Sequence, residues 1–215
     1  MNRTSLLIQP NNISNYEDIL KLQKKYQNNL IENSLKKQLI WIGEHNTVYT
    51  IGRGGKKKNI LKSLDQKEFD VLRIDRGGEV TCHMPGQLVV YLVLDLNHYK
   101  KDLNWFLRKI EFLIIKILRE VKVEGYTKNG YTGVWCENKK IASIGIGCKR
   151  WVTIHGFSIN VNCDLDHFNK IIPCGIEGCS MVNIKEFNKR VDILEVKKIV
   201  RKLIKQEFQI EFVSK

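Results

Sequence analysis

The sequence predicts an α+β fold in which a mixed or antiparallel central sheet is flanked by helices. Two observations support this class: three separated segments show helical apolar spacing, and the short apolar runs between them are joined by hairpin-like turns. The 215 residues include only three prolines and no repeat, low-complexity tract or polar linker. We therefore expect residues 1–215 to form a single domain, since this length suits one hydrophobic core.

The first third of the chain is predicted to contain one helix and two strands. Residues 16–32 are expected to be helical because apolar residues such as Ile19 and Leu22 recur at the spacing of one helix face. Short apolar runs at 39–42 and 48–51 are predicted strands on either side of a turn.

The middle third is predicted to contain two strands, a glycine-rich loop and a long helix. Strands are expected at 70–75 and 88–96, with the loop at 76–87 between them. Asp102 can cap a helix that runs to about residue 121, because its carboxylate would accept a backbone N–H. Glycine is costly in such a loop unless the backbone must bend sharply or approach a neighbour closely. The loop is therefore a candidate binding site.

The last third is predicted to contain three strands and a final helix. Strands are expected at 133–136, 140–146 and 152–162, where short apolar runs are separated by turns. A helix is expected at 193–206, where apolar residues again share one face.

The chain is strongly basic, with 36 Lys and Arg, 23 Asp and Glu, and a net charge of +13. This excess favours an acidic partner, although a solvated lysine-rich surface is the plainer explanation for part of it. No nucleic-acid-binding motif accompanies the charge, so nucleic acid is not an expected partner. No apolar run approaches the roughly 18 residues of a membrane span, and the N-terminus has no signal-peptide core. A cytoplasmic or organelle-matrix location without membrane contact is expected.

Cysteine and lysine supply the candidate catalytic chemistry. The six cysteines show no C-x-x-C pair and no zinc spacing, which predicts reduced thiols and no metal site. Cys174 stands out because Pro173 and Gly175 fix the backbone around it, although a buried inert thiol is the usual role of an isolated cysteine. Lys140 is the candidate partner, since a neighbouring ammonium favours a thiolate, although most lysines are simply solvated.

Two histidines are further candidates for a pocket. His83 and His155 each lie close to glycines that open the backbone, which suggests a shared pocket, although a purely structural histidine is the usual case. The glycines at 52–56 fit neither a phosphate loop nor a dinucleotide-binding motif, so they are predicted to form a turn.

Four segments together resemble the motifs of the lipoyl(octanoyl) transferases, in the family's order and at similar spacing. They are the loop at 76–87, the stretch from 133 to 145, the strand from 155 to 161 and the turn at 173–175, and the likeness extends upstream to 44–52. The family's fold resembles the catalytic domain of biotin and lipoate protein ligases. Its members move an octanoyl group from octanoyl-acyl carrier protein to a lysine on the lipoyl domains of 2-oxoacid dehydrogenases and the glycine cleavage H protein.

The resemblance implies a role for each matching residue. Cys174 would be the nucleophile that accepts the acyl group, and Lys140 its partner. No cofactor would be needed, because the thioester donor already stores the activation. Backbone N–H groups near Gly77, Gly78 or Gly145 would stabilise the oxyanion. The residues expected to line the acyl site are Arg76, Gly77, Gly78, Glu79, Val80, Thr81, Cys82, His83, Ser143, Ile144, Gly145, His155, Gly156, Phe157 and Ser158.

The chain departs from the family pattern at two positions of the loop. Cys82 stands where tyrosine is usual and Met84 where glycine is usual, and both would alter the wall beside the acyl chain. The nearest alternative function is an ATP-dependent lipoate–protein ligase of the same fold, which Lys140 would suit but the Cys174 motif would not. A basic nucleic-acid-binding module and an inactive scaffold of this fold are more distant alternatives.

Overall fold

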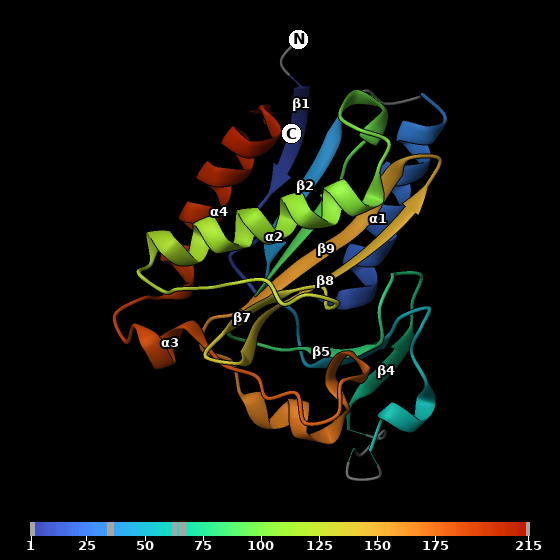
Figure 1. Ribbon diagram of the computed structural model, residues 1–215. Coiled ribbons are helices and arrows are strands. Elements are labelled where there is room, and N and C mark those ends of the chain that lie inside the picture. Colours follow the sequence, from blue (N-terminus) through green and yellow to red (C-terminus); the bar gives the residue numbers. More distant parts are fainter. Residues whose placement is uncertain (1–2, 34–36, 62–63, 65–67, 214–215) are drawn as a thin grey trace.

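The central sheet is built from the most apolar segments of the chain. The computed structural model describes residues 3–33, 37–61, 64 and 68–213, and its main sheet has seven strands (Figure 1). In spatial order they are β10 (Ile210–Val213), β1 (Arg3–Ile8), β2 (Gln38–Gly43), β6 (Gln87–Val93), β9 (Val152–Asn160), β8 (Lys139–Lys149) and β7 (Val134–Cys136). β1 pairs in parallel with β10 and β2, whereas the remaining neighbours are antiparallel. The predicted mixed sheet is confirmed.

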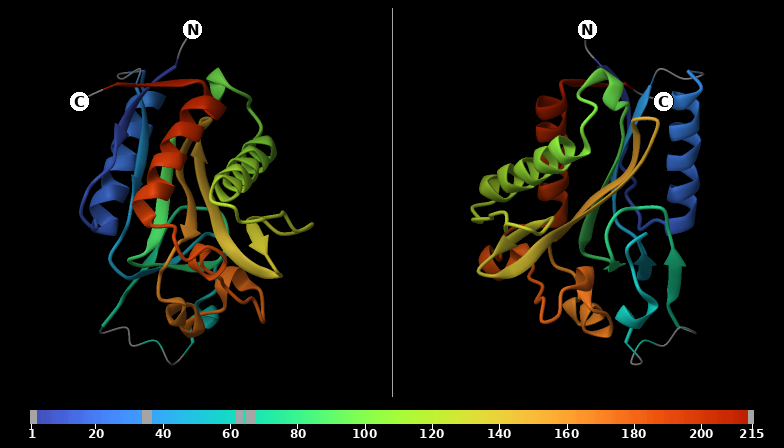
Figure 2. Two further views of the ribbon diagram at one scale, coloured as in Figure 1. Left: turned by 90° about the vertical axis from the view of Figure 1, so that its left-hand side faces the viewer. Right: turned by 45° about the vertical axis from the view of Figure 1, so that its right-hand side comes forward.

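A smaller sheet of three strands lies at the end of the main sheet away from the chain termini (Figures 1 and 2). Its strands are β4 (Asp70–Arg73), β3 (Val48–Ile51) and β5 (Val80–His83), in that spatial order. β3 is parallel to β4 and antiparallel to β5. The glycine-rich segment is therefore partly a strand.

Helices cover both faces of the main sheet. α1 (Tyr16–Ile31) lies on one face, and α2 (Leu103–Glu120) and α4 (Ile193–Phe208) lie on the other (Figure 2). Successive residues of a strand point to opposite faces. Accordingly, Leu39 of β2 packs in the apolar cluster beneath α1, and the next residue, Ile40, packs in the cluster beneath α2 and α4.

Each long helix begins at a side chain that accepts a backbone N–H. Asn15 accepts from Asp18 at 3.2 Å, Asp102 from the third residue beyond it at 2.9 Å, and Asp192 from the third residue beyond it at 2.8 Å. Such caps satisfy N–H groups that have no partner inside the helix. The predicted cap at Asp102 is confirmed. In the described part of the chain, no helix combines the length and apolar character needed to cross a membrane.

Five short helical turns were not predicted from the sequence, since none spans enough residues to show helical periodicity. They are η1 (Lys57–Asn59), η2 (Leu96–His98), η3 (Leu165–Lys170), η4 (Pro173–Gly175) and α3 (Ile184–Phe187). Two backbone hydrogen bonds tie η1 to the η3–η4 segment: Ile172 N–H donates to Asn59 O at 2.7 Å, and Leu61 N–H donates to Lys170 O at 3.0 Å. The turn that carries Cys174 is thereby held beside the small sheet.

Four strands correct the prediction. β1 and β10 were not expected, because each is short and its burial comes from pairing with distant parts of the chain. β5 was expected to be loop, but Val80, Thr81, Cys82 and His83 are all buried and pair with β3. The strand expected at 88–96 ends at Val93, since the chain turns into η2.

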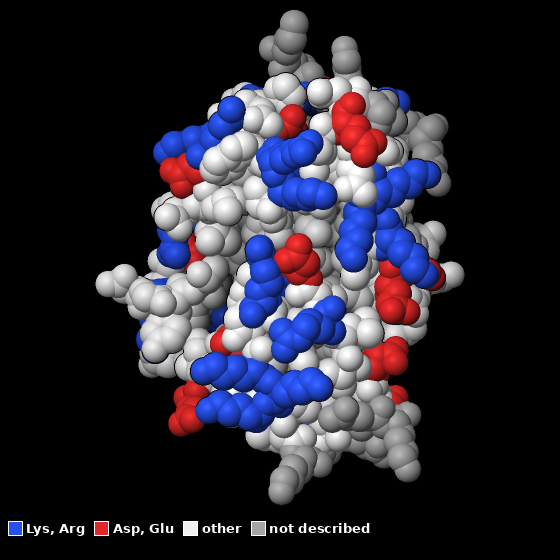
Figure 3. Space-filling view, turned by 90° about the vertical axis from the view of Figure 1, so that its right-hand side faces the viewer, with Lys and Arg blue, Asp and Glu red and all other residues white. Residues whose placement is uncertain are grey.

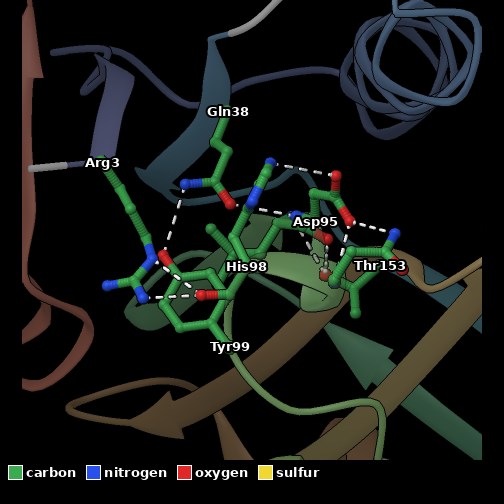
Figure 4. Close-up of polar contacts among 8 residues, drawn as sticks. Arg3, Gln38, Asp95, His98, Tyr99 and Thr153 are labelled. Carbon is green, nitrogen blue, oxygen red and sulfur yellow. Dashed lines mark hydrogen bonds and ion pairs between the residues drawn. The ribbon is translucent and has the colours of Figure 1, made fainter. Parts of the chain in front are cut away.

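A polar network fastens β1 and β2 to the segment around η2 (Figure 4). The Arg3 guanidinium donates to His98 O from Nε at 3.1 Å and from Nη2 at 2.6 Å, and it lies 4.2 Å from the ring centre of Tyr99. Gln38 accepts from Asp95 N–H at 3.0 Å and donates to the Tyr99 hydroxyl at 3.3 Å. These contacts hold the end of the sheet that lies away from the small sheet.

Candidate active site

A cavity of about 360 Å³ lies where the small sheet meets β8 and β9 of the main sheet. This volume is within the range of small-molecule sites, which is roughly 300–1,000 Å³. Fifteen of the residues predicted from the sequence line it: Arg76, Gly78, Glu79, Val80, Thr81, His83, Lys140, Ser143, Ile144, Gly145, His155, Gly156, Phe157, Ser158 and Cys174. Segments distant in sequence are thus brought to one place.

Cys174 lies in η4 with a left-handed backbone, φ 57° and ψ 17°. A residue with a side chain adopts this conformation at a cost, so the surrounding turn must hold it. The ring of Pro173 restricts the preceding φ, and Gly175 continues with φ +67° while donating its N–H to Ile172 O at 3.1 Å. A Cβ on Gly175 would lie 2.9 Å from Cγ of Glu79, so glycine lets the turn approach the opposite wall.

Lys140 places its ammonium directly on the Cys174 sulfur. Nζ lies 3.0 Å from Sγ of Cys174 and donates to Thr132 O at 3.0 Å, and the side chain is almost fully buried. Nζ also lies 5.0 Å from the ring centre of Trp135. The backbone is fixed as well, because Lys140 N–H donates to Ser180 O at 2.8 Å and its carbonyl accepts from Val182 N–H at 3.1 Å. An ammonium held in this way favours the thiolate form of a cysteine.

Positive charge and a hydroxyl add to the environment of the sulfur. Oγ of Ser143 lies 4.0 Å from Sγ of Cys174. The buried guanidinium of Arg76 donates to Gly77 O at 3.0 Å and to the carbonyl and hydroxyl of Thr50, each at 2.9 Å. Burial lowers the pKa of Arg76, while negative charge on neighbouring groups, Cys174 included, raises it. The site therefore favours negative charge near the sulfur.

Three buried histidines, His45, His83 and His155, form an imidazole cluster, and the last two of them line the cavity. His45 bonds the Tyr91 hydroxyl at 2.9 Å and Ser14 O at 3.0 Å, and His83 bonds Gln87 at 2.7 Å. Burial lowers the pKa of His45 to about 4 and those of His83 and His155 to about 3. The cluster is neutral at pH 7, so these rings act there as packing groups rather than as proton carriers. Within the described residues, no group of three or more His, Cys, Asp or Glu could hold a metal ion.

His155 also carries backbone strain within β9. Its φ is 62°, in the left-handed region, although it lies inside a strand. Its N–H donates to Gln23 of α1 at 2.7 Å. The sequence placed His83 and His155 in one pocket, and both line the cavity.

Gly77 and Cys82 are corrections to the predicted site, since neither lines the cavity. The N–H of Gly77 donates to Ile146 O at 2.9 Å, so it is not available for an oxyanion. Cys82 lies on β5 between Thr81 and His83, which line the cavity, and it points to the other side into the cluster that contains Tyr49 and Met84. Both departures from the family pattern therefore face away from the cavity.

Eight residues of the cavity wall were missed by sequence reasoning. Those with the clearest contribution are Thr132, which acts through its backbone carbonyl, and the tyrosines of α1 and β6, which are distant in sequence from the cysteine and lysine. A carbonyl carries no sequence signal, and the tyrosines could be placed only with the fold in hand. The eight are Tyr16, Val89, Tyr91, Gly130, Tyr131, Thr132, Gly175 and Ile176.

The chain is similar to a protein family and to curated relatives along most or all of its length. Residues 15–205 match the model of the lipoyl protein ligase A/B catalytic domain. Two curated relatives are the octanoyltransferase of Prochlorococcus marinus strain MIT 9312, 60% identical with all of both chains covered, and that of P. marinus subsp. pastoris, 62% identical with all of this chain and 99% of the relative covered.

Solved structures share the fold at low sequence identity. A structure of the bipartite lipoate protein ligase of an archaeal lipoylation system, from Thermoplasma acidophilum, is 16% identical with TM-score 0.74, covering 100% of this chain and 87% of that one. A lipoate-protein ligase A bound with ATP is 18% identical with TM-score 0.70, covering 100% and 89%. The biotin protein ligase of Aquifex aeolicus is 15% identical with TM-score 0.53, covering 96% and 69%. These likenesses confirm the predicted fold class.

Proposed function

The chain belongs to the lipoyl protein ligase A/B catalytic domain family and is an enzyme that transfers octanoyl groups, and from that premise we propose that it works through a thioester on Cys174. The donor would be octanoyl-acyl carrier protein and the acceptor a lysine of a lipoyl domain, as in the 2-oxoacid dehydrogenases and the glycine cleavage H protein. The observation that carries the proposal is the 3.0 Å contact between Lys140 Nζ and Cys174 Sγ at the cavity wall.

In the first step, the Cys174 thiolate attacks the carbonyl carbon of the donor thioester. The tetrahedral intermediate expels the thiolate of the carrier, which takes a proton from the Lys140 ammonium and leaves as a thiol. One thioester is exchanged for another, so this step needs no further activation. Gly77 N–H is already bonded and Gly145 pairs with Gly156 in the β8–β9 ladder, so Gly78 is the predicted oxyanion donor that remains.

In the second step, the lysine amine of the lipoyl domain attacks the acyl-enzyme. The neutral Lys140 amine takes the proton that the attacking nitrogen loses, the carbon–sulfur bond breaks, and the Cys174 thiolate returns beside the ammonium. The product amide is more stable than the thioester, which makes transfer favourable. Both forms of Lys140 are used once per cycle, so its contact with the sulfur must persist through the reaction.

The cavity supplies a wall of apolar side chains for the acyl chain. Val80, Val89, Ile144, Phe157 and Ile176 all face it. Burial of the six methylenes of an octanoyl chain contributes up to about 5 kcal/mol, at roughly 0.8 kcal/mol per CH₂. We propose that residues 1–215 work as one acyltransferase unit, because this cavity is lined from both sheets.

The charged surface suits acidic protein partners. Figure 3 shows a face on which Lys and Arg clearly outnumber Asp and Glu. Burial is the main cause that lowers the pKa of His155, a cavity residue, and the positive charges of Arg76, Lys24 and Arg53 lower it further. We expect transfer from an intact acidic carrier to weaken as salt rises, whereas transfer from a small octanoyl thioester should change little. Equal salt dependence for both donors would refute steering by surface charge.

The experiment that tests the proposal is incubation with octanoyl-acyl carrier protein in the absence of ATP, followed by mass spectrometry of the intact protein and its peptides. We expect one octanoyl group on the peptide that contains Cys174 and none in the Cys174→Ser variant. Octanoyl transfer that requires ATP, without this adduct, would instead favour a ligase. An adduct on another cysteine would contradict the role of Cys174.

A further inference from the structure

A carboxylate lies in the apolar layer between α2 and the sheet. Of the seven buried positions of α2, six are apolar and the seventh is Glu111. Its side chain is 1% exposed, and burial raises its pKa, while Gly133 N–H, Arg108 and Lys140 act in the opposite direction. Packing alone would be satisfied by an apolar residue here. The carboxylate must therefore be explained by what it contacts.

The two oxygens of Glu111 have different partners. Oε1 accepts from Gly133 N–H at 3.1 Å, and Oε2 lies 2.6 Å from Nη1 of Arg108, whose side chain is half exposed. Gly133 N–H belongs to the same peptide group as Thr132 C=O, which accepts from Lys140 Nζ at 3.0 Å. A single peptide group thus connects the carboxylate to the ammonium that contacts Cys174. Hydrogen bonds linked in this way polarise and strengthen one another.

Gly133 lets this peptide group approach Lys140 closely. Its φ is +136°, and a Cβ at this position would lie 2.6 Å from Cε of Lys140 and 2.7 Å from Ala142 O. Any side chain would push the peptide group away from the lysine. The close approach and the carboxylate behind it form one arrangement.

We infer that Glu111 is a positioning residue for octanoyl transfer, which acts through the 132–133 peptide group to hold Lys140 Nζ on Cys174 Sγ in its charged form. The inference rests on the proposed roles of Cys174 and Lys140. Four side chains form a series from the surface to the sulfur, and their charges alternate: Arg108 is positive, Glu111 negative, Lys140 positive and the Cys174 thiolate negative. Each charge is stabilised by its neighbours, and the solvent-exposed Arg108 ends the series.

Other titratable groups surround the pair and would contribute a constant background to its pH dependence. Arg76 and Glu79 face Cys174 from the loop before β5, and Cys179 follows on the segment after η4 with Lys128 close to it. None of these groups changes when Glu111 is replaced. A shift in the pH dependence of that variant therefore reports on the carboxylate.

The test compares Glu111→Gln with wild type and with Glu207→Gln. Glu207 also pairs with α2, through Lys109 and Lys116, but lies outside the cavity lining, so it is a matched control. Glutamine keeps the volume and an acceptor for Gly133 N–H, and removes the charge. We expect the alkaline limb of the transfer rate against pH to move down by about one pH unit, since the ammonium loses a nearby negative charge. On the alkaline side of the wild-type limb the rate should therefore fall by up to about 10-fold, with the melting temperature within about 3 °C of wild type.

Arg108→Gln provides an opposite perturbation and serves if Glu111→Gln does not fold. It keeps the carboxylate and removes the positive charge that partly neutralises it, so the alkaline limb should move to higher pH by a smaller amount. The inference is overturned if Glu111→Gln folds and its alkaline limb coincides with those of wild type and Glu207→Gln, or if Arg108→Gln moves the limb down. Failure of wild type to form an octanoyl adduct on Cys174 would instead overturn the proposed function.

Discussion

Acidification from pH 7.5 to 5.5 is expected to destabilise the fold strongly, because the imidazole cluster is buried in neutral form. The pKa is about 4 for His45 and about 3 for His83 and His155 in the folded state, against roughly 6.5 for histidine in an unfolded chain. Between these values the unfolded state binds more protons than the folded state. Stability from this source is therefore fully present above about pH 6.5 and is lost as the pH falls below it.

The magnitude follows from the difference in proton binding. At pH 5.5, one unit below the unfolded value, each neutral buried histidine costs about 1.4 kcal/mol relative to neutral pH. Three such groups give a loss of about 4 kcal/mol in the free energy of unfolding. This is a large part of the 5–15 kcal/mol that is typical of a folded domain.

Urea unfolding at pH 7.5 and pH 5.5, followed by circular dichroism, measures this loss. The His155→Asn variant replaces one titratable ring with asparagine, which tolerates φ 62°. The loss in the free energy of unfolding should then fall from about 4 to about 3 kcal/mol. His98 has an exposed side chain, and His98→Gln should keep the wild-type loss. If the free energy of unfolding of wild type falls by less than about 1 kcal/mol between the two pH values, the three histidines are not buried in neutral form.

Three further predictions concern the site itself. Lys140→Met keeps the volume but removes the ammonium, so we expect the Cys174 adduct to form roughly 10²- to 10⁴-fold more slowly. Rapid quenching and mass spectrometry measure this rate, and a near-normal rate would refute the role of Lys140. Gly133→Ala would place a Cβ 2.6 Å from Cε of Lys140 in a strained backbone. The transfer rate should therefore fall at least about 10-fold, and the free energy of unfolding in urea should fall by about 1–3 kcal/mol. A wild-type transfer rate would show that the peptide group need not approach the lysine. Cys82→Ala should leave the rates with hexanoyl, octanoyl and decanoyl donors in the wild-type ratio, because Cys82 faces away from the cavity; a changed ratio would place it on the acyl wall.

The fold class and the long helices could be predicted because they depend on local periodicity. The α1, α2 and α4 segments each place apolar residues on one face, and Asp102 marks the start of α2. By contrast, β1 and β10 are stabilised by pairing with segments distant in sequence, for which a single sequence gives no local signal. β5 was not predicted because its four residues lie in a segment that begins with the glycines at 77 and 78 and reads as loop.

The candidate site was predicted where unusual residues carry the chemistry and missed where the backbone does. Cys174 and Lys140 could be chosen by residue type and by resemblance, and the structure places them 3.0 Å apart. Thr132 contributes a carbonyl, which every residue has, and Glu111 lies on a helix face whose apolar pattern gave no reason to single it out. Cys82 was misassigned because alternation along β5 turns it away from the cavity, and that strand had been expected to be loop.

The most direct test of the central claim is a chase from isolated acyl-enzyme. Protein octanoylated on Cys174 would be separated from the donor and mixed with a lipoyl domain, and the appearance of octanoyl-lysine would be followed by rapid quenching. We expect the octanoyl group to pass to the lysine at a rate at least equal to steady-state turnover. An acyl-enzyme that keeps its octanoyl group, or releases it more slowly than turnover, would show that the thioester at Cys174 is not on the reaction path.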